Sequence, residues 1–352
     1  MFSNLPYMYM FLGVMSMGTI FSISSLHWLG IWAGLEINLI GFLPILVYQK
    51  SMSESESAMK YFIIQALGSS FIMFSSLMNY NMSFSWEIYT SETTFLLGFI
   101  FILSGLFMKL GVFPFHLWFP SVMAGLPWIT CLILTTWQKL APLFLLLSLL
   151  ECSNSYWFTL MLCICSGGSA LIGGLGGMNQ TQMRALLAYS SIAHMGWIMF
   201  SLLHSESIMK MYLSIYILMS ICMFTSLLMV NLNMMKNLNT LKNYSINHLN
   251  IMLMLLSLGG LPPLLGFISK WLVINISVTG PYLMYLSMLI LGSLMSLFYY
   301  LSLFFSMSLI SIKCYNMEMV YSASTKIFCM LIMFLNILGG LLILFFNSTY
   351  FY

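Results

Sequence analysis

The chain has 352 residues, of which 61% are hydrophobic and 5% are charged, with a formal net charge of +3. Soluble proteins carry about a quarter charged residues, so this composition excludes a soluble globular protein and indicates an all-α, polytopic membrane protein. The small net charge and the lack of a basic cluster also exclude nucleic-acid binding.

Eleven apolar segments follow one another along the chain, each close to the roughly 20 residues that cross a bilayer. The first has neither a basic region nor a cleavage pattern, so we expect a retained helix. The connections are too short for a soluble domain, which predicts a single transmembrane domain over residues 1–352. The expected segments are 7–25, 28–48, 58–79, 94–119, 129–150, 156–178, 183–203, 209–231, 248–274, 282–311 and 326–347.

The basic residues predict the orientation of these segments. Lys and Arg concentrate on the inner side of a membrane. With eleven crossings, Lys210 is the basic residue on one side, together with Glu87, Glu92, Glu151 and Glu206. We therefore expect the N-terminus inside and the C-terminus outside. The inner side or its helix ends would hold Lys50, Lys60, Arg184, Lys236, Lys242, Lys313 and Lys326.

Two segments contain residues that interrupt a helix. The fourth has Gly111 and Pro114 directly after Lys109, and the ninth has GGLPP at 259–263 before Lys270. Proline removes a helical hydrogen bond, and irregular backbone at membrane depth is tolerated only inside protein or beside water. Paired broken helices in the two halves of a transporter point to its ion site. We therefore expect breaks near 110–114 and 259–263, within antiporter-like inverted repeats.

Four ionisable residues lie inside long apolar runs: Glu36, Lys109, Lys139 and Lys270. Each costs roughly 2.5–3.5 kcal/mol at the centre of a bilayer on insertion scales. A chain with so few charges is expected to use them, and burial makes a lysine able to exchange protons near neutral pH. The alternative is that these side chains reach toward the membrane surface or form static ion pairs.

Two histidines are further candidates for proton transfer. His194 lies in ALLAYSSIAHMGW, where an imidazole can relay protons, although a structural histidine in the interior is nearly as good an interpretation. His116 follows the first break and is a weaker candidate, for capping the break or lining the path by which protons enter.

Sites for cofactors and metals are not predicted. The seven cysteines form no CxxC pair, which argues against a metal or iron–sulfur centre. No segment has two histidines spaced for haem. GGLGG at 173–177 lacks the dinucleotide-binding pattern and is typical of close helix packing.

Several motifs occur together in a known order. They are GLEINLIGFLP at 34–44, KLGVFPFHLWFPSVMAGLPW at 109–128, TTWQKLAP at 135–142, GGMNQTQMRALLAYSSIAHMGW at 176–197 and LSLGGLPPLLGFISKW at 256–271. In these the chain resembles the NADH–ubiquinone oxidoreductase chain 2 family, antiporter-like membrane subunits of respiratory complex I, in its animal mitochondrial form. The last 75 or so residues are similar only in hydropathy.

The resemblance implies a role for each candidate residue. Glu36 matches a glutamate that pairs with the lysine at Lys109, Lys139 matches the central lysine, and Lys270 matches the lysine of the second broken helix. His194 matches a histidine on a central hydrophilic axis. The resemblance also implies the inner mitochondrial membrane, with the N-terminus in the matrix.

The implied function is proton translocation coupled to NADH oxidation and ubiquinone reduction elsewhere in the complex. The implied partners are other complex I membrane subunits and phospholipids, without NADH or iron–sulfur contact in this chain. Movement of Glu36 away from Lys109 would release a proton toward Lys139 and then Lys270. A stand-alone cation/proton antiporter and a purely structural scaffold subunit are the alternatives.

Overall fold

The computed structural model describes residues 7–48, 51–87, 96–152, 156–230, 245–278, 280–312, 330–334 and 336–340, and these are almost entirely helical. Within these ranges, the β-structure is a single isolated bridge between His27 and Glu87. The all-α prediction is therefore confirmed. The helices are α1 (Met8–Ser24), α2 (Trp28–Leu46), α3 (Met52–Ser83), α4 (Leu96–Leu110), α5 (Trp118–Gly125), α6 (Trp128–Thr135), α7 (Trp137–Cys152), α8 (Tyr156–Met178), α9 (Met183–Leu202), α10 (Glu206–Val230), α11 (Ser245–Gly259), α12 (Leu265–Ser277) and α13 (Leu283–Ile312).

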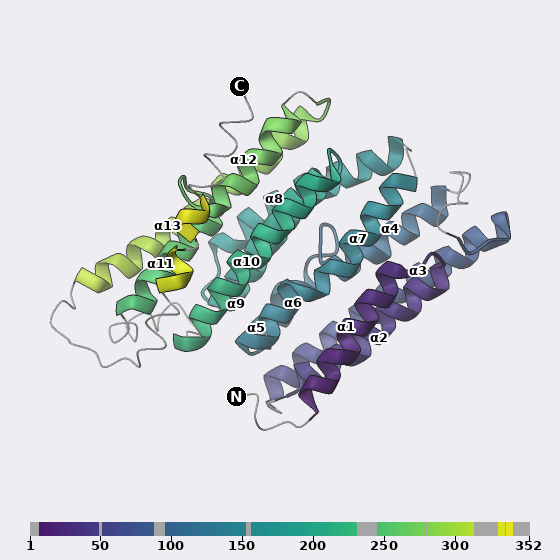
Figure 1. Cartoon of the computed structure of the whole chain (residues 1–352), viewed down its shortest axis with the longest axis horizontal. Helices are drawn as coiled ribbons and strands as arrows, with labels where there is room; N and C mark the ends of the chain where they lie inside the picture. Colours follow the sequence, from purple (N-terminus) through teal and green to yellow (C-terminus); the bar gives the residue numbers. More distant parts are fainter. Residues whose placement is uncertain are drawn as a thin grey trace. The chain divides into compact units, whose positions relative to one another are not determined.

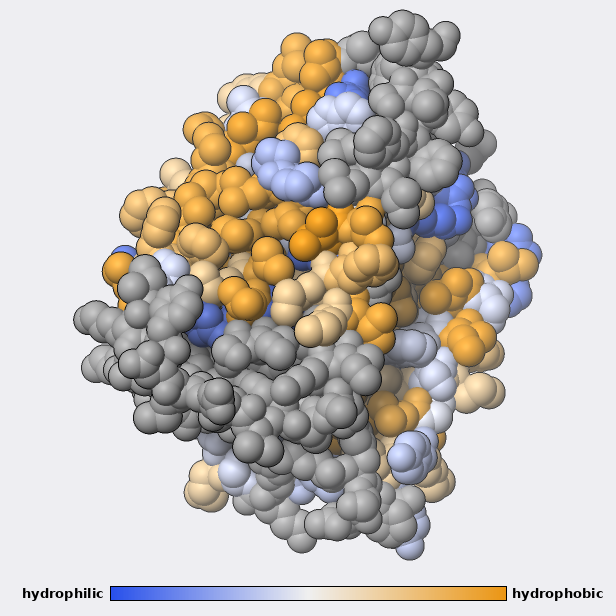
Figure 2. Space-filling model, turned by 60° about the vertical axis from the view of Figure 1, so that its left-hand side comes forward, coloured by the Kyte–Doolittle hydropathy of each residue, from blue (hydrophilic) through white to orange (hydrophobic). Residues whose placement is uncertain are grey.

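Seven helical stretches are long and apolar enough to cross a membrane, counting α6 and α7 together. Shorter apolar helices include α1, α4, α11 and α12. Where residues are described, the face drawn in Figure 2 is mostly hydrophobic, as expected for a surface in contact with lipid or with apolar neighbours. The chain is thus a multi-pass membrane protein, and the number of eleven crossings stays a prediction.

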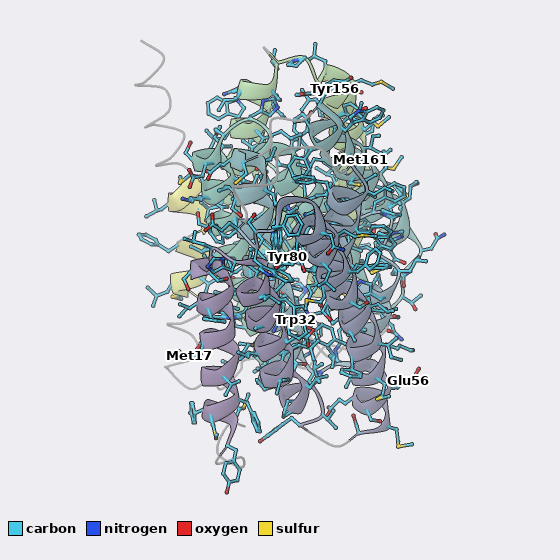
Figure 3. The ribbon with its side chains drawn as sticks, turned by 90° about the vertical axis from the view of Figure 1, so that its right-hand side faces the viewer. Met17, Trp32, Glu56, Tyr80, Tyr156 and Met161 are labelled. Atoms are coloured by element: carbon cyan, nitrogen blue, oxygen red, sulfur yellow. The ribbon has the colours of Figure 1, made fainter. Side chains whose placement is uncertain are left out.

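The chain divides into two compact units, Met1–Leu162 and Cys163–Tyr352. In the first unit, α1 and α2 run side by side (Figure 1) and α3 packs on α2, α4 and α5. Small residues allow the close contact of α1 with α2: a Cβ on Gly18 would lie 2.6 Å from the backbone nitrogen of Asn38. The outward face of α1 is apolar, and Met17, labelled in Figure 3, is 67% exposed.

Helix α3 begins six residues earlier than the expected segment, at Met52. Ser51 caps it by accepting a hydrogen bond from the backbone N–H of Glu54 (3.3 Å), and Ser-x-x-Glu is the spacing of a capping box. Near this end (Figure 3), Glu56 pairs with Lys60 at 2.5 Å. The expected segments leave residues 49–57 as a connection, and this expectation was wrong for residues 52–57, because the capping signal outweighs the polarity of the segment.

Both predicted breaks are confirmed. Helix α4 ends at Leu110 and α5 begins at Trp118, while α11 ends at Gly259 and α12 begins at Leu265. The helix that follows the first break, α5, continues to Gly125. Residues 120–128, which the expected segments leave as a connection, are therefore largely helical.

The two breaks have the same local geometry. Gly111 (φ +67°) and Gly260 (φ +83°) adopt the left-handed conformation that ends a helix. In each, the N–H groups of the glycine and of the next residue donate to one carbonyl, that of Phe107 or Leu256. A cis X–Pro bond follows at the same spacing, Phe113–Pro114 and Pro262–Pro263.

In the second unit, α9 is almost completely buried: all its residues except Arg184 and Tyr189 lie in the interior. It contacts α10, α12 and α13. The glycines of α8 allow backbones to approach closely, as predicted: a Cβ on Gly173 would lie 2.6 Å from the backbone nitrogen of Ala193.

Several sequence predictions fall outside the described residues. They concern the orientation and the last segment, whose described parts, 330–334 and 336–340, are helical. The orientation and the single-domain organisation stay predictions. The residues concerned are Lys50, Glu92, Lys236, Lys242, Cys314, Lys313, Lys326 and Cys329.

The contact between α8 and α13 gives a prediction about stability. A Cβ on Gly292 would lie 2.4 Å from the carbonyl oxygen of Ala170, so Gly292→Ala forces two backbones apart. We expect the free energy of unfolding to fall by about 1–3 kcal/mol, measured as a lower melting temperature of the purified protein. The control is Gly13→Ala, because nothing lies within 4 Å of a Cβ there. Equal melting temperatures for the two variants would contradict this packing.

Candidate functional site

The three lysines predicted from the apolar runs are buried in the packed helices. The exposed fractions of Lys109, Lys139 and Lys270 are 7%, 4% and 8%. Lysines that reach for the membrane surface would be exposed at their amino ends, so this alternative does not describe them. Each must be compensated by groups inside the protein.

Lys109 lies in the last turn of α4 and interacts electrostatically with Glu36, a half-buried residue of α2. Both residues lie in the described part of the chain, and their charged atoms are further apart than the 4.0 Å limit for a direct ion pair. The carboxylate therefore acts on the ammonium through space. Such an interaction stays strong where little water screens it.

The stem of Lys109 packs where α3 and α4 are closest. A Cβ on Gly68 would lie 3.3 Å from Cγ of Lys109 and 3.2 Å from the carbonyl oxygen of Gly105. A Cβ on Gly105 would in turn lie 2.7 Å from the carbonyl oxygen of Gly68. These two glycines leave room for the lysine stem between the helices.

A small polar cavity of about 10 Å³ adjoins Lys109. This is close to the space that one water molecule needs. Two of its lining residues, Asn38 of α2 and Gln138 of α7, hydrogen-bond to each other in both directions. Nδ2 of Asn38 donates to Oε1 of Gln138 (2.9 Å), and Nε2 of Gln138 donates to Oδ1 of Asn38 (3.2 Å). The lining residues are Leu35, Asn38, Leu39, Tyr61, Gln65, Lys109, Gln138 and Pro142.

Lys139 lies on a different face of α7 from Gln138. Its Nζ is 5.1 Å from the ring centroid of Phe119 on α5, a distance at which the aromatic face attracts a cation. The sequence analysis missed Phe119. A signal was available, because the aromatic run that follows the first break must pack inside the protein.

The helix that carries Lys139 matches the expected segment 129–150: Trp128–Cys152 is one apolar stretch. Within it, Thr136 separates α6 from α7, although its backbone N–H still donates to the carbonyl of Leu132 (3.0 Å). The hydroxyl of Thr136 donates to the same carbonyl (2.7 Å), a back-bond that commonly bends helices. This irregularity lies three residues before Lys139.

Lys270 contacts the end of the broken helix in the second unit. Its Nζ donates to the carbonyl oxygens of Gly259 (3.0 Å) and Leu258 (3.5 Å), the last residues of α11. The last carbonyls of a helix have no intrahelical partners and form the negative end of its dipole. The break therefore supplies the negative charge density that this lysine requires.

His194 is buried on α9, and its Nδ1 is hydrogen-bonded to the hydroxyl of Tyr212 on α10 (3.0 Å). The ring of Tyr216, one turn further along α10, lies 5.4 Å from the imidazole. The hydroxyl of Tyr212 also interacts with Ser269, the neighbour of Lys270 on α12. Tyr212 was missed because a tyrosine in an apolar helix has no distinctive sequence signal.

His116 lies in the first break and is half-buried, with Nδ1 3.1 Å from the carbonyl oxygen of Pro114. This contact agrees with a role in holding the break. The first unit thus contains Glu36, Lys109, Lys139 and His116, and the second contains His194 and Lys270.

The membrane domain of the NADH:quinone oxidoreductases and Mrp antiporters matches residues 25–298 of the chain. Proteins named NADH-ubiquinone oxidoreductase chain 2 are similar over most of their length. That of Lumbricus terrestris is 36% identical over 86% of this chain and 87% of its own, and that of Anopheles gambiae is 40% identical over 86% of each. The chain belongs to this family.

Solved structures of membrane complexes share the fold of this family member. A chain of the respiratory complex I of Thermus thermophilus has a TM-score of 0.82 at 25% identity, covering 96% of this chain and 80% of the other. A chain of the Mrp complex of a Dietzia species has a TM-score of 0.74 at 13% identity, covering 83% of this chain and 59% of the other. The latter likeness concerns the fold alone.

In this family member, the contact of His194 with Tyr212 gives a prediction. Tyr212→Phe removes the buried hydroxyl that bonds Nδ1 of His194 and interacts with Ser269, and each such hydrogen bond contributes about 1 kcal/mol. We expect a modest fall in melting temperature and a changed ring position of His194 in a high-resolution density map. The control is Tyr216→Phe, which removes a neighbouring buried hydroxyl and leaves the bond to Nδ1 in place. An unmoved His194 ring in Tyr212→Phe would contradict the assignment.

Proposed function

We propose that this chain is an antiporter-like membrane subunit of a respiratory NADH–ubiquinone oxidoreductase in the inner mitochondrial membrane. In this role it carries part of the proton translocation that NADH oxidation and ubiquinone reduction drive elsewhere in the complex. Its partners are the other membrane subunits of the complex and phospholipids, and the chain itself holds no redox cofactor.

The observation that supports proton transfer by this chain is the position of the buried lysines at or beside the two helix breaks. Lys109 lies two residues before Gly111, and Lys270 contacts the carbonyl of Gly259. Lys139 faces the ring of Phe119 on α5, the helix that follows the first break. Interrupted helices at membrane depth provide main-chain polar groups and room for water. Lysines placed there are able to exchange protons in an otherwise apolar bundle.

The proposed mechanism begins at Glu36 and Lys109. When a change in a neighbouring subunit moves the carboxylate away, the ammonium of Lys109 loses a favourable interaction and releases its proton more readily. The proton passes to Lys139 and, with His194 as a relay, to Lys270. Moving one charge against the membrane potential costs about 2.3 kcal/mol per 100 mV, which is the scale of one such electrostatic change.

Lys139→Met tests the relay. The methionine side chain fits the apolar surroundings, so we expect normal assembly of the complex. NADH oxidation should continue in detergent and should be inhibited in coupled vesicles. Proton uptake into vesicles per NADH oxidised should be strongly reduced. The matched control is Lys210→Met, because Lys210 is exposed and paired with Glu206 on the surface of α10. Full proton uptake in Lys139→Met would rule out the relay.

Neutralising Glu36 together with the three buried lysines separates the relay from a scaffold role. In a variant with Glu36→Gln, Lys109→Met, Lys139→Met and Lys270→Met, a scaffold subunit would still support proton translocation. A relay subunit would not. The family model that matches residues 25–298 includes Mrp antiporters as well, so a stand-alone antiporter is a second candidate. That candidate requires the purified chain to exchange cations for protons in liposomes by itself, and we expect no such exchange.

A further inference from the structure

The reciprocal hydrogen bonds of Asn38 and Gln138 join the helix of Glu36 to the helix of Lys139. Asn38 is two residues after Glu36 on α2, and Gln138 is directly before Lys139 on α7. Both bonds have good length, 2.9 Å and 3.2 Å. Helices that carry two members of the proposed relay are thus connected by two neutral amides.

Each amide has capacity left for another partner. A carboxamide has two N–H donors and an oxygen with two lone pairs. The pair uses one donor and one lone pair of each residue, so one N–H and one lone pair remain on each. The pair is able to bind a further polar molecule without separating.

The cavity beside the pair has the size and the lining for a water molecule. Its volume is about 10 Å³, and its lining includes three further residues with polar groups, Lys109, Gln65 and Tyr61, together with the amide pair. A buried water requires two to four polar partners and a space of about 10–15 Å³. This site supplies both.

The polar α7 residue at this cavity is Gln138, beside Pro142 of the same helix, while Lys139 is not among the lining residues. The Nζ of Lys139 instead faces the ring of Phe119. In this structure Lys109 therefore meets α7 through the amide of Gln138. A proton leaving Lys109 toward α7 would first encounter the site at the amide pair.

We propose that Asn38 and Gln138 are positioning residues that hold one water molecule against the ammonium of Lys109. This inference rests on the proton transfer proposed above. The water takes a proton from Nζ of Lys109 and gives another to a second water molecule on the way to Lys139, so the held water is unchanged. The net result of this step is one proton moved from Lys109 to the second water, which passes it on toward Lys139. The amides do not change protonation state; they fix the water and the distance between α2 and α7.

A purely structural clamp would have a different signature. Replacing both partners of a buried hydrogen-bonded pair by apolar groups of similar shape is often nearly neutral for stability. In Asn38→Leu/Gln138→Met, a clamp would be replaced by apolar contact and proton translocation would persist. A water site would lose its polar lining, because neither leucine nor methionine can hold the water.

The experiment measures proton uptake per NADH oxidised in liposomes containing the whole complex, together with the amount of assembled complex. We expect the apolar double variant to assemble and to lose about tenfold or more in the rate of proton uptake, the effect of losing a hydrogen bond to a charged group. The exchange variant Asn38→Gln/Gln138→Asn keeps the combined length and both hydrogen bonds. It should retain uptake, whereas each of its single changes should reduce it.

The outcomes separate this inference from the proposed function. Normal uptake in the apolar double variant, with uptake lost in Lys109→Met, would overturn the water site and leave the relay intact. Normal uptake in Lys109→Met itself would overturn the relay. If the apolar double variant fails to assemble, the exchange variant decides: loss of uptake there, with normal assembly, would also overturn the proposed positioning.

Discussion

Burying a lysine among apolar helices is the constraint on which this structure depends. An ammonium group loses its hydration when it is buried, and the protein must replace that hydration with its own dipoles and charges. The chain does so differently at each position. Lys109 has a distant carboxylate and a polar cavity, Lys139 has an aromatic face, and Lys270 has the carbonyl end of a helix. The three lysines are therefore accommodated by three different kinds of neighbouring group.

Helix interruptions connect these compensations to the chain trace. A continuous transmembrane helix satisfies all its backbone groups internally and offers nothing to a buried charge. Ending α11 at Gly259 frees the carbonyls that Lys270 contacts, and ending α4 at Leu110 places the break directly after Lys109. The same residues that weaken the helices thus allow charged side chains to remain inside them.

Much of this arrangement could be predicted from the sequence, because membrane helices and their breaks depend on local chemistry. Hydropathy indicated the apolar helices, and Gly111 with Pro114 indicated the first break. The capped start of α3 at Met52 was misjudged, since the polar residues of the segment suggested a loop although Ser51 and Glu54 carry a capping signal. The contacts of Lys139 with Phe119 and of His194 with Tyr212 were not predictable, because they depend on which helix faces meet after folding.

The contact of Lys270 with α11 has a chemical consequence. An ammonium has three N–H donors, and two of them serve the carbonyls of Gly259 and Leu258. When the third hydrogen departs, the neutral amine still has two donors and can keep both contacts. In the proposed relay, loss of a proton from Lys270 therefore leaves the end of α11 bonded, so the main chain does not have to rearrange when the side chain gains or loses a proton.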